Sequence, residues 1–128
     1  MNSSTIYLAD DDPDDRFLIK EAINEIYKQI TFIEAANGLE LLSSIESLTD
    51  PSQALILLDM NMPMMNGLEA ITAIRKNPRF SSVQAIMVST SSDPSLAERA
   101  LQAGINSFFT KPDTFEGFVN LAKNLKTN

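Results

Sequence analysis

The chain has 128 residues, 44% hydrophobic and 21% charged, which is typical of one ordinary globular domain. It contains no cysteine or histidine, which excludes disulfide bonds, thiolate or imidazole metal sites and catalysis by a histidine base. A net charge of −7 argues against nucleic-acid partners. No apolar stretch approaches the roughly 20 residues of a membrane helix and no signal-peptide pattern is present, so we expect a cytoplasmic protein without a membrane partner.

The acidic residues are concentrated at one place near the N-terminus. Five of the 17 acids lie within six positions, at Asp10, Asp11, Asp12, Asp14 and Asp15, and the remaining 12 are nearly balanced by ten bases. The dipole of a helix favours acids at its N-terminus, and this explains the last three of the five. The first two need another explanation.

Short apolar runs alternate with longer amphipathic segments from Thr5 onward. Several of the runs lack polar alternation, which is typical of strands whose two faces are both covered by helices in a parallel sheet. The strand-length runs are residues 6–9, 32–33, 54–58, 85–88 and 107–109. Apolar residues recur at helical spacing within residues 19–30, 41–48, 68–74, 97–101 and 115–125.

Signals that begin and end helices agree with this division. Asp12-Pro13 and Asp93-Pro94 each place an N-cap residue before a proline at the first helical position. Asn77-Pro78 closes the third helix, and Gly104 is a C-terminal stop for the fourth. Five strands alternating with five helices predict right-handed β-α-β units, and hence an α/β fold with an open parallel sheet between two helical layers.

Polar side chains follow four of the predicted strands at the point where each strand ends. Asp10 and Asp11 follow the first strand, and Asp59, Ser89 and Lys111 follow the third, fourth and fifth. Ligands of open α/β sheets bind beyond these carboxyl ends, so we expect the side chains to converge on one rim. Crowded carboxylates need a cation, and oxygen ligands alone favour Mg²⁺. With a lysine to pair with an anion, the set predicts phosphoryl transfer to a carboxylate.

From Thr5 to about Lys126, the chain resembles the receiver domain of two-component response regulators. The matching elements are Asp10-Asp11, residues 58–67 (LDMNMPMMNG), Ser89 and Lys111-Pro112, with 30 residues from Asp59 to Ser89 and 22 from Ser89 to Lys111. The resemblance implies one receiver domain over residues 1–128, a flavodoxin-like fold and the strand order 2-1-3-4-5. It also implies a stand-alone regulator, somewhat similar to chemotaxis receivers and to those of phytochrome-type or hybrid kinases.

The resemblance implies a metal-assisted phosphorelay. Asp59 would accept a phosphoryl group from a sensor histidine kinase or a histidine phosphotransfer protein. Asp11, Asp59 and the backbone carbonyl of Asn61 would bind Mg²⁺ directly, and Asp10 would act largely through water. The protein would catalyse only its own phosphorylation and dephosphorylation, so it is not expected to be an enzyme for other substrates.

The resemblance also implies a conformational switch. Ser89 would hydrogen-bond the phosphoryl group, Lys111 would pair with one of its oxygens, and a cis Lys111–Pro112 peptide bond would aim the ammonium inward. Phe108 would follow Ser89 as a switch residue, without the hydroxyl that many receivers carry at this position. The face formed by the fourth helix, fifth strand and fifth helix would then dock an unidentified downstream protein or a second copy of the chain.

Three other functions stay open on the sequence alone. A Mg²⁺-dependent phosphatase that forms an aspartyl-phosphate commonly has a second acid two residues after its nucleophile, where this chain has Asn61. A flavodoxin-like electron carrier needs a first loop that cradles a phosphate, and the acidic loop here would repel one. A receiver-like adaptor that is never phosphorylated would not need every expected site residue.

Overall fold

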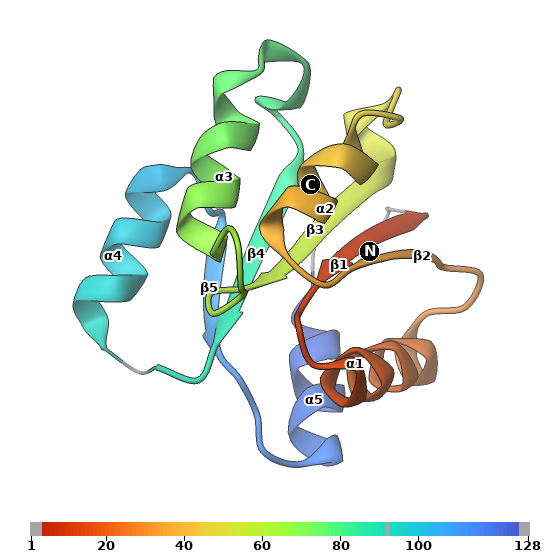
Figure 1. The fold of residues 1–128 in the computed structure, drawn as a ribbon. Coiled ribbons are helices and arrows are strands. Elements are labelled where there is room, and N and C mark those ends of the chain that lie inside the picture. The colour runs from red at the N-terminus through yellow and green to blue at the C-terminus, as the bar shows by residue number, and fades with distance from the viewer. Residues whose placement is uncertain (1–3, 92, 126–128) are drawn as a thin grey trace.

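The computed structural model describes residues 4–91 and 93–125 and shows five strands alternating with five helices (Figure 1). The strands are β1 (Thr5–Ala9), β2 (Thr31–Ala35), β3 (Ala54–Asp59), β4 (Gln84–Ser89) and β5 (Ser107–Thr110). The helices are α1 (Pro13–Ile26), α2 (Gly38–Ile45), α3 (Gly67–Lys76), α4 (Pro94–Ala103) and α5 (Phe115–Lys123). Two short 3-10 helices, η1 (Pro51–Gln53) and η2 (Pro78–Phe80), precede β3 and β4. Lys126, where the resemblance was expected to end, lies outside the described residues.

The sheet has the predicted strand order. All five strands are parallel in the order β2-β1-β3-β4-β5. Strands β1 and β3 are neighbours in register, with Ala9 paired to Leu58, so their carboxyl ends lie side by side. This is the point where the winding of the chain reverses and where open α/β sheets bind ligands.

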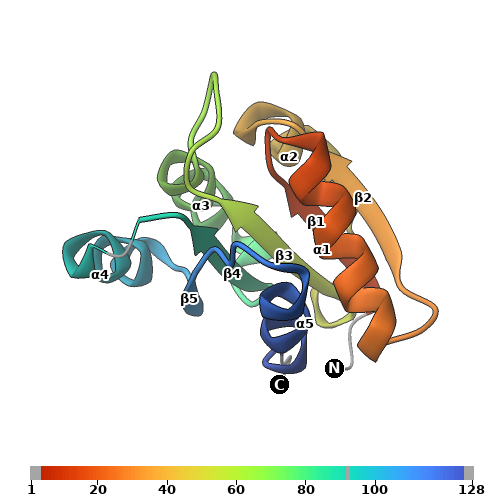
Figure 2. The same cartoon turned by 90° about the horizontal axis from the view of Figure 1, so that it is seen from below.

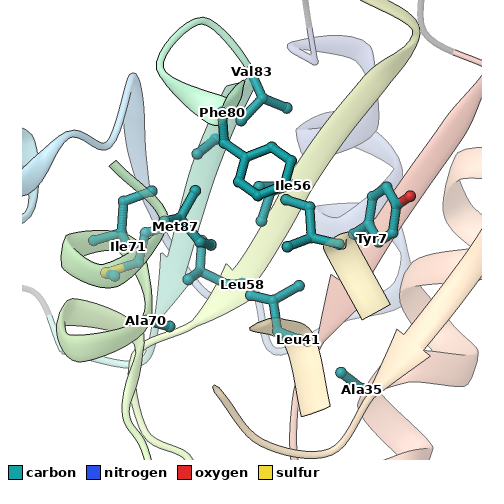
Figure 3. Packing of buried hydrophobic residues seen from close by; sticks show 14 of the residues in the cluster. Tyr7, Ala35, Leu41, Ile56, Leu58, Ala70, Ile71, Phe80, Val83 and Met87 are labelled. Atoms are coloured by element: carbon teal, nitrogen blue, oxygen red, sulfur yellow. The ribbon is translucent and has the colours of Figure 1, made fainter. Parts of the chain in front are cut away.

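Helices cover both faces of the sheet, as predicted. Helices α1 and α5 pack together on one face, and α2, α3 and α4 cover the other (Figures 1 and 2). All six residues of the central strand β3 are buried. Leu55 and Leu57 enter the core beneath α1 and α5, whereas Ile56 and Leu58 enter the opposite core. Figure 3 shows the second core, which contains Tyr7, Leu41, Ile56, Leu58, Ile71, Phe80 and Met87.

The ends of two helices confirm the predicted capping. Asp12 and Asp93 accept hydrogen bonds from backbone N–H groups of the first turns of α1 and α4, and a proline follows each cap. Gly104 ends α4 with a φ of +120°, in the region that favours glycine. Asn77 ends α3, and Pro78 begins η2.

Three apolar residues lie beyond the helices to which the spacing assigned them. Ile30, Leu48 and Leu125 follow the last residues of α1, α2 and α5. Leu48 and Leu125 are nevertheless buried, because the loops after the helices continue to cover the same cores. The buried surface at these two ends therefore extends beyond the last helical residue. Within residues 4–91 and 93–125, no helix combines the length and apolar character that crossing a membrane requires.

The C-terminus of α4 generates a stability prediction. A Cβ at Gly104 would lie 2.5 Å from Cγ of Arg75, whose Nε and Nη2 donate to the Gly104 carbonyl at 3.0 and 2.8 Å. Gly104→Ala should lower the free energy of unfolding by about 2 kcal/mol, because it strains the backbone and displaces Arg75. Urea denaturation measures this change. The exposed Gln102→Ala is the control and should shift stability by less than about 0.5 kcal/mol; equal effects of the two variants would contradict the prediction.

Candidate functional site

The predicted residues lie at the carboxyl ends of the strands. Asp10 follows β1, Asp59 and Ser89 end β3 and β4, and Lys111 follows β5. Asp10, Asp59 and Ser89 are buried, whereas Asp11 is exposed. Buried carboxylates at an otherwise apolar strand end are costly unless other groups compensate them.

Three carboxylates at this rim could hold a metal ion. Each of Asp10, Asp11 and Asp59 offers one oxygen, and these atoms all lie within 4.8 Å of one another. The backbone N–H of Asn61 hydrogen-bonds the Asp59 carboxylate from the loop that follows β3. A set of hard oxygen donors with no thiol or imidazole fits Mg²⁺, which takes a few carboxylates and completes its shell with water.

Lys111 supplies the positive charge in the site. Its Nζ lies 2.8 Å from Oδ2 of Asp10, 2.8 Å from Oδ2 of Asp15 and 3.6 Å from Oδ2 of Asp59. Burial disfavours the ammonium, but its hydrogen bonds to Asp10 and Asp15 and the charge of Asp59 outweigh burial and raise the pKa of Lys111 above its usual value. Lys111 therefore remains a cation at any physiological pH.

The buried carboxylates are under electrostatic strain. Burial, followed by the charge of Asp10, raises the pKa of Asp59 from 3.8 to about 6, although Lys111 and the N–H of Asn61 oppose the shift. Burial also raises the pKa of Asp10, despite its hydrogen bond to Lys111. The single ammonium of Lys111 thus leaves the pair undercompensated, and an added cation would relieve both.

Asp15 is part of the site, although the sequence suggested only a role at the start of a helix. It lies in the first turn of α1, and its carboxylate bonds Lys111 at 2.8 Å. Side chains in a helix tilt toward its N-terminus, so a first-turn residue of a helix that begins at the rim points back to the rim. That geometry is the signal that could have identified Asp15. Asp12 and Asp14 do lie in the N-cap and exposed first turn.

Arg16 holds the loop between β1 and α1 in place. Its Nη1 donates to the backbone carbonyl of Asp10, and its Nε donates to Oε1 of Glu34 on β2 at 2.9 Å. The Asp10 carboxylate also accepts the backbone N–H of Asp12 at 3.0 Å. Asp10 is thus fixed through its backbone and its side chain, whereas Asp11 next to it is free of such bonds among the contacts of the described residues.

The loop between β3 and α3 folds back onto Asp59. The N–H of Gly67 donates to the carbonyl of Met60 at 2.9 Å, and a Cβ at Gly67 would lie 2.6 Å from the carbonyl oxygen of Asp59. Asn66 caps α3 in a reciprocal pair with Glu69. Met64 takes a φ of +68° at the exposed tip. The glycine is therefore required for close approach to the backbone of the site.

The expected cis peptide bond at Lys111–Pro112 is wrong. All peptide bonds of the described residues are trans, including this one. With a trans bond, the Lys111 ammonium already reaches Asp10 and Asp15. The Lys111 ammonium thus faces the acids of the rim from a trans peptide bond.

The two residues expected to switch occupy neighbouring strands. The Ser89 hydroxyl is buried and accepts the N–H of Ser91 at 3.2 Å, and the Ser89 carbonyl accepts the N–H of Lys111 at 2.6 Å. Phe108 is half-buried on β5, pairs with Met87 and packs against the core beneath α2, α3 and α4. The backbone of Ser89 is therefore hydrogen-bonded to the residue that follows β5, and the switch itself stays a prediction.

Comparison with known proteins identifies the family. A family model described as the response regulator receiver domain matches residues 6–123. The chain belongs to this family. This receiver domain is 31% identical over 112 residues to the probable chemotaxis protein CheY of Rhizobium etli, which is 87% of this chain and 83% of that protein. It is also 30% identical over 125 residues, 95% of this chain, to the sensor histidine kinase CheAY of Helicobacter pylori, covering 15% of that kinase.

The fold is similar to that of a cyanobacterial response regulator. The phosphorylated phytochrome response regulator RcpA aligns with a TM-score of 0.84 and 23% identity, over 94% of this chain and 89% of that chain. This receiver domain is thus a CheY-like response regulator of two-component signalling, as the sequence predicted. Receiver domains are signalling proteins that bind Mg²⁺ at an acidic aspartate cluster and interact with histidine kinases. None of the three alternative functions gains support.

The raised pKa of Asp59 generates a prediction about stability. Between its usual pKa of 3.8 and the folded value of about 6, the folded state binds more protons than the unfolded state. The free energy of unfolding of the metal-free protein should therefore fall as the pH rises through this window. Asp59→Asn should raise the free energy of unfolding near pH 7.5 by about 1–3 kcal/mol and flatten the pH profile. Urea denaturation in a chelator at several pH values measures both effects.

The control for this experiment is Asp14→Asn, which removes one negative charge from an exposed residue of the first turn of α1. It should change stability by less than about 0.5 kcal/mol. Millimolar Mg²⁺ should raise the melting temperature of the wild type, and much less that of Asp59→Asn. If Asp59→Asn raises the free energy of unfolding of the metal-free protein no more than Asp14→Asn does, the prediction is contradicted.

Proposed function

We propose that this receiver domain accepts a phosphoryl group on Asp59 from a histidine kinase or a histidine phosphotransfer protein. The observation that carries the proposal is a buried carboxylate with the Lys111 ammonium 3.6 Å away and two further carboxylates beside it. With a pKa of about 6, Asp59 is largely ionised at neutral pH and can act as a nucleophile. An Asp59 oxygen would form a bond to phosphorus as the bond from phosphorus to the donor histidine breaks, and the histidine nitrogen keeps the electron pair.

The neighbouring groups would prepare Asp59 for this reaction. Asp11, Asp59 and the backbone carbonyl of Asn61 would hold Mg²⁺ directly, with Asp10 acting largely through water. When bound, Mg²⁺ supplies positive charge that offsets the crowded acids and the incoming phosphoryl oxygens. Lys111 would pair with one phosphoryl oxygen, and the hydroxyl of Ser89 would donate to another. The protein would catalyse only its own phosphorylation and dephosphorylation.

The output would be a change in a protein-binding surface. Ser89 ends β4, which leads to α4, and Lys111 follows β5, which leads to α5. Drawing both toward a phosphoryl group would therefore shift the start of each helix. Phe108 would follow Ser89 as the switch residue on β5. Leu101 and Phe115 are large hydrophobic residues exposed on α4 and α5. A downstream protein or a second copy of the chain would dock on this α4-β5-α5 face.

Phosphorylation by a small donor tests the acceptor. With acetyl phosphate and Mg²⁺, the wild type should gain one phosphoryl group, and removal of Mg²⁺ should abolish the gain. Asp59→Asn should lower the rate at least about 100-fold, because an amide is not a nucleophile of comparable strength. Mass spectrometry of the intact protein measures incorporation. Asp14→Asn should incorporate phosphate like the wild type, and a comparable rate in Asp59→Asn would show that another residue is the acceptor.

Amide hydrogen exchange tests the switch. In the beryllofluoride complex, protection should change at residues 89–112 as well as in the loops around Asp10 and Asp59. Ser89→Ala should retain binding but weaken the remote changes, because it removes one donor to the anion. Lys111→Ala should reduce the changes in protection at residues remote from Asp59 more than Ser89→Ala does. If changes stay confined to the loops around Asp10 and Asp59 in the wild type, the switch does not operate.

A further inference from the structure

Asp15 makes a contact that the proposed function does not use. Its Oδ2 lies 2.8 Å from Nζ of Lys111, as close as Asp10, whereas Oδ2 of Asp59 lies at 3.6 Å. The contact joins α1 to the loop after β5 across 96 positions of sequence. The Lys111 side chain is 9% exposed and that of Asp15 is 27% exposed, so the ion pair is only partly screened by water.

The Lys111 ammonium therefore hydrogen-bonds Asp10 and Asp15 rather than Asp59. It has three N–H donors, and Asp10 and Asp15 accept at ordinary hydrogen-bond distance. The 3.6 Å separation from Asp59 is too long for a good hydrogen bond. Asp15 also lies outside the three described carboxylates that could share a metal ion, so a cation bound there would not replace Lys111 as its partner.

We propose that Asp15 is a positioning residue that holds Lys111 away from Asp59 and thereby lowers the affinity of the site for a phosphoryl group or its mimic. The inference rests on the proposed function. An anion on Asp59 has to draw the Lys111 ammonium from Asp15. The contact thus favours the unoccupied state, and its strength sets how strongly an anion must compete for Lys111.

Beryllofluoride binding to the full chain at saturating Mg²⁺ tests the inference. The chain has no tryptophan, so amide NMR shifts of Thr90 and Lys111 provide the signal. Asp15→Asn keeps the size of the side chain and removes its charge, and it should tighten binding about five- to tenfold. Asp14→Asn is the matched control and should stay within about twofold of the wild type. Asp15→Glu retains the carboxylate and should bind more weakly than Asp15→Asn.

A second background separates positioning from simple repulsion. With Lys111→Met, the ammonium is gone, so adding Asp15→Asn should change the affinity by less than about twofold. If Asp15→Asn still tightens beryllofluoride binding five- to tenfold in the Lys111→Met background, the positioning role would be overturned. The positioning role would also be overturned if urea denaturation shows that Asp15→Asn is folded, yet the variant binds beryllofluoride no more tightly than Asp14→Asn does. A wild type that binds no beryllofluoride with Mg²⁺ would instead overturn the proposed function, and this inference with it.

Discussion

A buried ammonium surrounded by carboxylates is the interaction on which the site depends. Asp10 and Asp59 have lost most of their hydration, and carboxylates so placed would be expelled or protonated without a nearby cation. Lys111 provides that cation from the loop after the edge strand β5, while the acids come from the central strands. Charge balance at the rim therefore links the centre of the sheet to its edge, and through Asp15 it links both to α1. The strand order is what makes this possible.

Burial in the site disfavours the charged form of both Asp59 and Lys111, but neighbouring charges compensate only the lysine fully. Burial, followed by the charge of Asp10, raises the pKa of Asp59, so the ionised carboxylate is held at a cost in stability. Burial opposes the ammonium of Lys111, but its hydrogen bonds to Asp10 and Asp15 raise its pKa and secure the charge. A site satisfied by its own side chains would have little free energy to gain from a metal ion or a phosphoryl group. Lys111 compensates the charge of the buried carboxylates only in part, so binding a metal ion can still lower the free energy of the site. Binding sites commonly give up stability for function in this way.

The sequence predicted most of the fold because both faces of the sheet are covered. Runs such as residues 54–58 had no polar alternation, and every one of these side chains is buried. The strand order came from the family resemblance, since apolar runs do not say which strands are neighbours. Asp10, Asp11, Asp59 and Lys111 could be placed at one rim because each follows a strand. Asp15 could have been placed there from its position in the first turn of α1, but its contact with Lys111 also depends on the rotation of α1 and could not be predicted. The sequence also did not predict the trans bond before Pro112.

The Arg75 guanidinium gives α4 a fixed end. It donates to the carbonyls of Gly104 and Phe80 and to Oδ1 of Asn106, which in turn accepts the N–H of Ala85. These bonds attach the C-terminus of α4 to α3, η2 and β4, whereas its N-terminus follows the loop that begins at Ser89. Helix α4 is therefore held at Gly104, and a tilt about this residue would move its N-terminal end most. Because ten residues of helix span about 15 Å, a tilt of about ten degrees moves the Asp93 end by roughly 2–3 Å while Gly104 stays still. In the proposed switch, a small displacement of the strand ends would thus be larger at the Asp93 end of α4 than at Gly104.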